Sequence, residues 1–181
     1  DDNIQHLNPM EHIRRRLGMY IGRAGDGSDY DDGIYVLLKE VIDNAIDEFI
    51  MGFGRRVEIR LDWNSGACAI RDFGRGIPLG KVVDAVSILN TGGKFDDKAF
   101  KKSVGLNGVG TKAVNALSSD FYVCSHRDGE CASASFTRGE LIESSEGPTK
   151  EKDGTMIRFT PDPLMFGEYA FNEDYVVTMV K

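Results

Sequence analysis

Three polar side chains, Glu40, Asn44 and Asp47, recur at i, i+4 and i+7 in a segment whose apolar pattern predicts a long helix. This spacing puts them on one face, opposite the apolar stripe, with Asp43 and Glu48 close by. For a helix taken alone, a solvated polar face is the simplest interpretation. The face also suits chemistry, because a carboxylate such as Glu40 can orient and deprotonate a water molecule. An amide oxygen such as that of Asn44 is a ligand for hydrated Mg²⁺.

A second candidate site is the segment 72–78 (DFGRGIP), which directly follows a predicted strand. Aspartate and glycine are common in surface turns, so a turn without function is the alternative interpretation. As a binding site, the carboxylate of Asp72 would accept a hydrogen bond from an exocyclic amine such as that of adenine. Gly74 and Gly76 have no side chains, so a flat ring can approach the backbone there.

Residues 105–112 (GLNGVGTK) lead into a predicted helix and form a third candidate, because glycine-rich backbone amides at a helix N-terminus bind phosphate. Two familiar motifs do not fit. The order Thr111-Lys112 reverses the end of a Walker A loop, and no apolar strand precedes the loop as a dinucleotide fold requires. The whole segment 91–110 has five glycines and four lysines, including Lys94. It is either a solvated loop or a flexible lid whose charge offsets a triphosphate.

These groups must be positioned by helices and strands. The order of the predicted elements favours an α+β two-layer sandwich, in which helices cover one face of a mixed, mostly antiparallel sheet. The long helix is expected at 34–51, and Asp128-Gly129 indicates a tight hairpin. Locally paired strands and clustered helices argue against a doubly wound parallel sheet. The other predicted elements are helices at 8–17, 81–89, 111–117 and from Asn172 onward, and strands at 56–61, 67–71, 121–127, 130–136, 141–143 and 155–160.

Length and composition restrict the class of protein. A chain of 181 residues, with 41% hydrophobic and 28% charged residues, is expected to form one globular domain. The net charge of −7 argues against a nucleic-acid-binding module acting alone, and no apolar stretch reaches the ~20 residues of a membrane span. Three cysteines without C-x-x-C spacing and scattered histidines predict a reduced, cytoplasmic protein without a zinc site. The start at Asp1 and the short final helix suggest a piece of a longer protein.

The order of these motifs resembles that of the GHKL ATPase superfamily. The order is Glu40-x-x-x-Asn44, then Asp72-x-Gly-x-Gly76, then a glycine-rich lid, then Gly154-Thr155. Within the superfamily, the chain is most similar to the ATPase subunit of bacterial type IIA DNA topoisomerases. The stretches that carry this likeness are 18–22, 40–48, 91–95 and 105–110, and the stretches 37–49 and 99–119 are nearer to the topoisomerase IV branch than to the gyrase branch.

The resemblance implies a role for each matching residue. Glu40 would be the general base, and Asn44 would hold the Mg²⁺ that bridges the phosphates of ATP. Asp72 would bind the adenine amine, assisted through water by Thr155. Further nucleotide-binding positions would be Gly76, Ile77, Gly93, Lys94, Gly105, Leu106, Asn107, Gly108, Val109, Gly110 and Thr111. The rim of the pocket, where competitive inhibitors bind in this family, would comprise Asp47, Glu48, Arg75, Pro78 and Arg127.

The resemblance also implies partners. ATP would drive homodimer closure of the complete ATPase region, and a separate DNA-cleaving subunit would complete a heterotetramer that holds DNA. This segment alone is expected to bind DNA poorly, to stay largely monomeric and to hydrolyse ATP slowly, because the family's N-terminal arm and transducer domain would lie outside it. Phe100, Asn107 and Leu17 depart from the tyrosine, histidine and proline common in the family. Gyrase, another GHKL ATPase and a non-catalytic nucleotide sensor remain alternatives.

Overall fold

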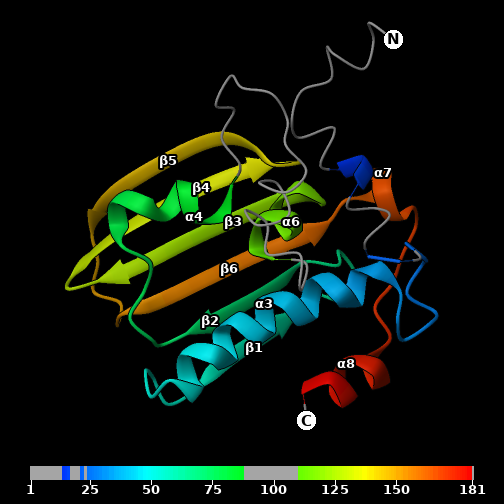
Figure 1. Ribbon diagram of the computed structural model, residues 1–181, viewed down its shortest axis with the longest axis horizontal. Coiled ribbons are helices and arrows are strands. Elements are labelled where there is room, and N and C mark those ends of the chain that lie inside the picture. The colour runs from blue at the N-terminus through cyan, green and yellow to red at the C-terminus, as the bar shows by residue number, and fades with distance from the viewer. Residues whose placement is uncertain (1–13, 17–20, 23, 88–109, 181) are drawn as a thin grey trace, which may run out of the picture.

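The computed structural model describes residues 14–16, 21–22, 24–87 and 110–180. Six strands form one sheet in the order β1-β2-β6-β3-β4-β5, and every neighbouring pair in it is antiparallel. The helices α3, α4 and α6 lie on the near face of this sheet in Figure 1. The predicted α+β two-layer sandwich is therefore confirmed. The strands are β1 (Val57–Leu61), β2 (Cys68–Asp72), β3 (Ser118–Arg127), β4 (Glu130–Thr137), β5 (Glu140–Pro148) and β6 (Gly154–Pro161).

The strand β6 comes last in the chain but lies in the middle of the sheet. It pairs with β2 through contacts such as Ile70↔Ile157, and with β3 through contacts such as Val123↔Ile157. It therefore joins the β1–β2 hairpin to the β3–β4–β5 meander. The β3–β4 hairpin has the predicted tight turn, since Asp128 and Gly129 both adopt positive φ, 54° and 83°.

The strand β5 is longer than the sequence indicated. The apolar pattern predicted only 141–143, whereas β5 pairs with β4 over Glu140–Pro148. Most of its side chains are exposed, including Leu141 and Ile142, and its three glutamates, Glu140, Glu143 and Glu146, are spread along the strand. Edge strands are often charged in this way, which discourages further strand pairing, and the result is a sequence pattern that hides the strand.

The bounds of the long helix agree with the sequence prediction, whereas those of the short helices agree less well. The predicted helix at 81–89 begins as a 3₁₀ turn, η1, and continues as α4 only as far as Val86, because Ser87 is already extended. The short helix α7, which Asp162 caps, was not predicted. Most of the predicted helix at 8–17 and all of the loop at 91–109 lie outside the described residues. The bounds are α3 (Gly33–Ile50), η1 (Leu79–Lys81), α4 (Val82–Val86), α6 (Thr111–Ala116), α7 (Pro163–Phe166) and α8 (Glu173–Val180).

The helix α3 forms because its apolar residues recur with helical spacing and pack on the sheet. Ile34, Leu38 and Ile42 from this stripe are almost fully buried, as are Phe121 and Phe159 from the central strands. At full burial, each such side chain stabilises the fold by roughly 1.5–3 kcal/mol before the entropic cost of ordering is counted. The helix is thereby fixed against β2, which sets the position of its polar face.

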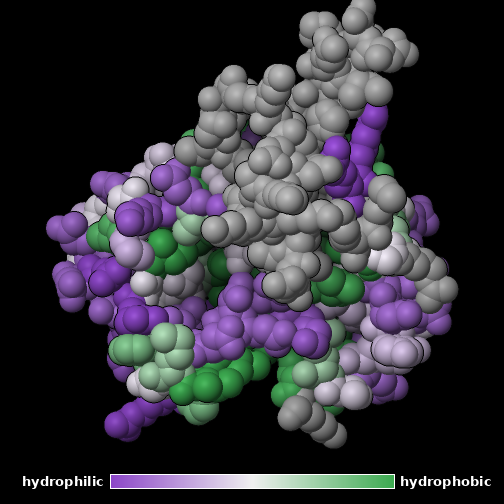
Figure 2. All heavy atoms as spheres, viewed as in Figure 1, coloured by the Kyte–Doolittle hydropathy of each residue, from purple (hydrophilic) through white to green (hydrophobic). Residues whose placement is uncertain are grey.

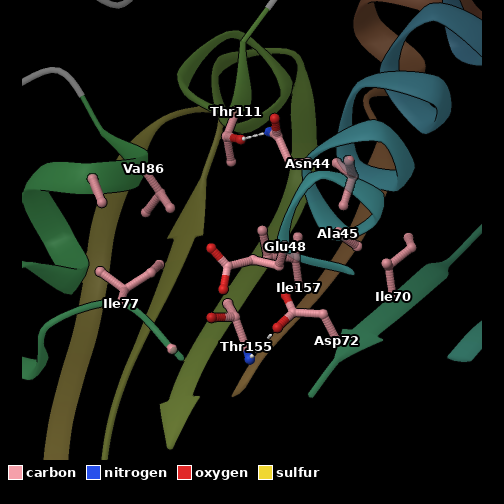
Figure 3. Close-up of a pocket in the computed structure, with 13 residues that line it drawn as sticks. Asn44, Ala45, Glu48, Ile70, Asp72, Ile77, Val86, Thr111, Thr155 and Ile157 are labelled. Atoms are coloured by element: carbon pink, nitrogen blue, oxygen red, sulfur yellow. Dashed lines mark hydrogen bonds between the residues drawn. The ribbon is translucent and has the colours of Figure 1, made fainter. Parts of the chain in front are cut away.

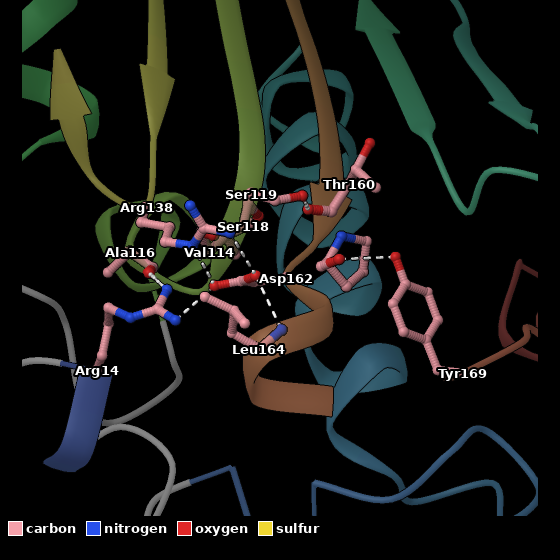
Figure 4. A network of polar contacts seen from close by, with 11 residues as sticks. Arg14, Val114, Ala116, Ser118, Ser119, Arg138, Thr160, Asp162, Leu164 and Tyr169 are labelled. Atoms are coloured by element: carbon pink, nitrogen blue, oxygen red, sulfur yellow. Dashed lines mark hydrogen bonds and ion pairs between the residues drawn. The ribbon is translucent and has the colours of Figure 1, made fainter. Parts of the chain in front are cut away.

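A buried carboxylate, Asp162, anchors the end of β6 (Figure 4). Its side chain is 0% exposed, pairs with Arg14, accepts from Arg138 Nε at 2.9 Å, and caps α7 by accepting from Leu164 N at 3.0 Å. Arg14 also donates to Ala116 O at 2.8 Å. Burial raises the pKa of Asp162, but the Leu164 amide and the two guanidinium groups outweigh it and hold the pKa below its ordinary value of 3.8. One carboxylate thus joins four separate segments.

We expect Asp162→Asn to destabilise the 181-residue chain by about 2–3 kcal/mol, because it removes the shared partner of Arg14 and Arg138. The loss is moderate because the Arg138 side chain is partly exposed to solvent. The contribution of the ionised group is complete above the ordinary pKa and is lost as pH falls through the lower native pKa. Urea unfolding between pH 3 and 7 should therefore show a flatter acid limb for the variant. The exposed Asp84→Asn is the control, and equal stability of the two variants would contradict the assignment.

Candidate functional site

A pocket opens between α3, the strands β2 and β6, and the N-terminus of α6 (Figure 3). Its volume is about 180 Å³. That is smaller than the about 300–1,000 Å³ typical of sites that enclose a whole drug-sized ligand. Its polar lining comes from α3, β2, α6 and β6, and its apolar lining from α3, α4 and the strands. The lining residues are Val41, Asn44, Ala45, Glu48, Ile70, Asp72, Gly76, Ile77, Ala85, Val86, Thr111, Thr155 and Ile157.

Asp72 lies at the base of the pocket, at the end of β2, and is buried. Its Oδ1 accepts hydrogen bonds from Gly74 N at 3.0 Å and from Thr155 N at 3.3 Å. Both bonds use Oδ1, so Oδ2 is the oxygen available to a ligand. Burial raises the pKa of Asp72, and the two backbone amides only partly offset this effect. The arrangement is an oriented, desolvated hydrogen-bond acceptor.

Two glycines allow the backbone to close around this carboxylate. Gly154 has φ of +138°, and a Cβ there would lie 2.2 Å from Asp72 O. Gly76 has φ of +77°, and a Cβ there would lie 2.8 Å from His126 O. The loop after Gly76 is held by Ser125 Oγ, which donates to Ile77 O at 2.7 Å. Side chains at either glycine would force β2, β3 and β6 apart.

Asn44 and Thr111 meet across the mouth of the pocket. Asn44 Nδ2 donates to Thr111 Oγ1 at 2.7 Å, which leaves the amide oxygen Oδ1 as the atom that a ligand can use. Thr111 is the first residue of α6, after Gly110 with φ of +82°. The first backbone amides of a helix have no partner within it, so this end of the pocket offers N–H donors beside an amide oxygen.

Glu48 and Arg75 form an ion pair at the rim. Arg75 Nη2 lies 2.8 Å from Glu48 Oε1, and the backbone N of Arg75 donates to Glu48 Oε2 at 3.1 Å. The hydrogen bond from Arg75 lowers the pKa of Glu48. Arg75 also stacks over Phe53, with 4.1 Å from its guanidinium carbon to the ring centroid. The pair holds the loop after β2 against the last turns of α3.

The polar face of α3 borders the apolar stripe, whereas the sequence analysis placed it opposite. Asn44 and Glu48 line the pocket together with Val41 and Ala45 from the stripe itself. The side of α3 turned to the viewer in Figure 2 is mostly hydrophilic. Asp47 is exposed and lies outside the lining, while Glu48, one turn after Asn44, takes part in it. Because polar and apolar residues of α3 adjoin each other here, the pocket has both an apolar wall and a polar mouth.

The structure brings together seven of the residues that the sequence singled out, and leaves others near by or undescribed. Glu40 is half-buried one turn before Asn44 on α3, and is not among the lining residues. The lining includes Asn44, Glu48, Asp72, Gly76, Ile77, Thr111 and Thr155 but not Asp47, Arg75, Pro78, Gly110 or Arg127. Gly93, Lys94, Gly105, Leu106, Asn107, Gly108 and Val109 lie outside the described residues, as do Leu17 and Phe100.

Sequence reasoning missed the apolar residues of the pocket. Val41 and Ala45 belong to the stripe that predicted core packing, and Ile70 and Ile157 are ordinary buried positions of strands. Val86 ends a short helix. Burial in a core and exposure to an apolar pocket produce the same sequence pattern, so no signal in the pattern separates them. Within the described part of the chain, no helix is both long and apolar enough to cross a bilayer.

Several known proteins are similar to this chain over nearly all of its length. It is 56% identical over 176 residues to the B subunit of DNA topoisomerase 4 from Borreliella burgdorferi, covering 97% of this chain and 29% of that protein. It is 38% identical over 183 residues to the B subunit of DNA gyrase from Thermotoga maritima, covering 96% of this chain and 28% of that protein. The chain therefore spans less than a third of the length of these relatives.

A solved structure has the same fold. The crystal structure of the 43K ATPase domain of Thermus thermophilus gyrase B, in complex with an aminocoumarin, superposes with a TM-score of 0.71 at 32% identity. The match covers 97% of this chain and 45% of that one. The model of the histidine kinase-, DNA gyrase B- and HSP90-like ATPases matches residues 29–164, which include the whole of the described pocket. The chain belongs to this ATPase family, the GHKL superfamily that its motif order resembles.

Proposed function

We propose that this chain binds ATP, with the adenine ring in the pocket and its exocyclic amine donating to Asp72 Oδ2. The observation that carries the proposal is the carboxylate itself, which is buried, oriented by Gly74 N and Thr155 N, and directed into an apolar pocket. A volume of about 180 Å³ suits a purine base better than a whole nucleotide. The ribose and phosphates would then extend toward Asn44, Thr111 and the predicted lid at 91–110.

The mouth of the pocket fits a Mg²⁺ ion carried by the nucleotide. Mg²⁺ prefers hard oxygen ligands, keeps several waters and is bound mainly through substrate phosphates. Asn44 Oδ1 offers one neutral oxygen, because the amide nitrogen is engaged with Thr111. When bound, the ion would neutralise charge on the phosphate oxygens. Backbone amides from Gly105 to Thr111, and Lys94, are the proposed phosphate contacts.

We further propose that ATP is hydrolysed with Glu40 as the general base. Glu40 lies on α3 one turn before Asn44, so a water molecule beside the terminal phosphate would be within reach of both. Phosphoryl transfer to water depends mainly on positioning and electrostatic stabilisation, which the amides of the lid and α6 would supply. Asp47, Glu48, Arg75, Pro78 and Arg127 are the proposed rim against which competitive inhibitors of the ATP site would bind.

The relatives support a role as the N-terminal ATPase domain of a bacterial type IIA DNA topoisomerase. We favour topoisomerase IV over gyrase because one topoisomerase 4 relative is 56% identical, although a second is 38% identical, the same as the gyrase relative. In this proposal, ATP closes a homodimeric gate in the cytoplasm, and a separate DNA-cleaving subunit completes the heterotetramer that passes one duplex through another. DNA would be held mainly by parts of the enzyme outside this chain, whose own charge is −7.

Replacing Asp72 separates ligand binding from folding. We expect Asp72→Asn to weaken binding of a non-hydrolysable ATP analogue by about 10- to 100-fold, since one charge-assisted hydrogen bond is lost. The pKa of Asp72 is raised, so its ionised form destabilises the fold at neutral pH, and the variant should be at least as stable as the parent. As pH falls through the raised pKa of Asp72, the stability of the parent should rise relative to that of the variant, which lacks the titrating group.

Calorimetric titration of the 181-residue chain measures the affinity, and thermal unfolding at pH 4 to 8 measures the stability. Asp120→Asn, an exposed position on β3, is the matched control. Binding that survives Asp72→Asn unchanged would show that the pocket is assigned to the wrong ligand.

Replacing Glu40 distinguishes an ATPase from a nucleotide sensor, in which ATP only drives association. In the full-length protein we expect Glu40→Gln to lower kcat by at least about 100-fold, the range of a lost general base, while the analogue binds normally. Asp43→Asn on the same helix, whose carboxylate accepts from the exposed Lys39 at 2.9 Å, should leave both unchanged. Turnover close to that of the parent in Glu40→Gln would exclude Glu40 as the base.

A further inference from the structure

Three side chains of metal-ligand type meet on the β3–β4 hairpin. Cys124 and His126 lie two residues apart on β3, and Cys131 on β4 is the direct partner of His126 in the register. Ser125, between the first two, points to the pocket side, where it bonds to Ile77 O. Because side chains alternate along a strand, Cys124 and His126 point to the opposite face of the sheet, away from α3, α4 and α6.

The spacing of the ligand atoms is near that of a metal centre. One ligand atom from each of the three residues lies within 4.8 Å of the other two, and Cys124 Sγ is 3.4 Å from His126 Nε2. A tetrahedral ion with bonds of about 2.3 Å to sulfur and 2.0–2.1 Å to nitrogen needs separations of about 3.6–3.8 Å. Small rotations of the side chains on a fixed hairpin would suffice to reach this geometry.

The chemical state of the three groups also suits an ion. Neither Cys124 nor Cys131 is in a disulfide, Cys124 Sγ already lies at hydrogen-bond distance from His126 Nε2, and His126 Nδ1 is buried without a hydrogen-bond partner among the described residues.

We propose that Cys124, His126 and Cys131 form a binding site for a thiophilic divalent cation of the Zn²⁺ class, with a water molecule as the fourth ligand. On binding, each thiol releases its proton to solvent, and two thiolates balance the charge of the ion. The site is separate from the nucleotide pocket, which lies on the other face of the sheet. The sequence analysis predicted no zinc site because the cysteines lack C-x-x-C spacing and the histidines are scattered, whereas the hairpin brings Cys131 opposite His126.

Cobalt(II) is the probe for this site, because thiolate coordination gives a sulfur-to-metal charge-transfer band and tetrahedral geometry gives intense visible bands. The 181-residue chain is titrated anaerobically with Co²⁺ in a non-thiol reductant, and Zn²⁺ is then added in competition. We expect one equivalent of Co²⁺ to bind with both kinds of band, and Zn²⁺ to displace it. A parent chain with all thiols reduced that shows no charge-transfer band would overturn the proposal.

Variants test whether these three residues are the ligands. We expect Cys124→Ser, Cys131→Ser and His126→Gln each to weaken Co²⁺ binding by about 100-fold or more, beyond the 10- to 100-fold typical of outer-shell changes. Two controls should bind normally. These are Cys68→Ala, which removes a fully buried thiol on β2, and Ser133→Ala, which changes the residue opposite Cys124.

Circular dichroism confirms that each variant is folded, and Cys131→Ser, at a half-buried position, is the variant least expected to disturb folding. Bands that persist in Cys124→Ser and Cys131→Ser would also overturn the proposal. Binding of the ATP analogue should be unchanged in Cys131→Ser, so failure of the metal site and failure of the nucleotide site give different results.

Discussion

The insertion of β6 between β2 and β3 is the contact on which both the sheet and the pocket depend. In the sheet, β2 and β3 are joined only through β6, which pairs with each of them in antiparallel register. The same strand supplies Thr155 N to Asp72 and ends at Asp162, which ties α7, Arg14 and Arg138 together. A change that weakens the pairing of β6 therefore affects the orientation of Asp72 as well as the stability of the fold.

The pocket combines an apolar wall with a carboxylate that burial makes costly to ionise. The helix α3 contributes to both parts, because Val41 and Ala45 from its buried stripe lie beside Asn44 and Glu48. Binding sites commonly reduce stability in this way, since a group desolvated for a ligand has no full substitute for water in the free protein. Asp162 is the contrasting case, because two arginines and a helix cap compensate its burial and its pKa is lowered.

The sequence predicted the layers, the long helix and the central strands because their apolar periodicity is strong. It also singled out Asn44, Asp72 and Gly76 as candidates, the family resemblance added Thr155, and all four line the described pocket. It did not predict the length of β5, since an exposed edge strand has no apolar alternation. The apolar wall and the contact of Asn44 with Thr111 depend on residues brought together by tertiary folding, which a local pattern cannot reveal. The pairing of His126 with Cys131, by contrast, follows from the predicted tight turn at Asp128-Gly129.

The late position of β6 in the chain has a consequence for synthesis on the ribosome. Asp72 and Thr155 are 83 residues apart, so at about 5–20 residues per second the Asp72 carboxylate is made roughly 4–17 s before the amide that orients it. During that interval the edges of β2 and β3 that later flank β6 have unpaired backbone groups, which makes the nascent chain prone to mispairing. Productive folding is thus delayed until the last strand emerges, and the pocket forms late in translation of this segment.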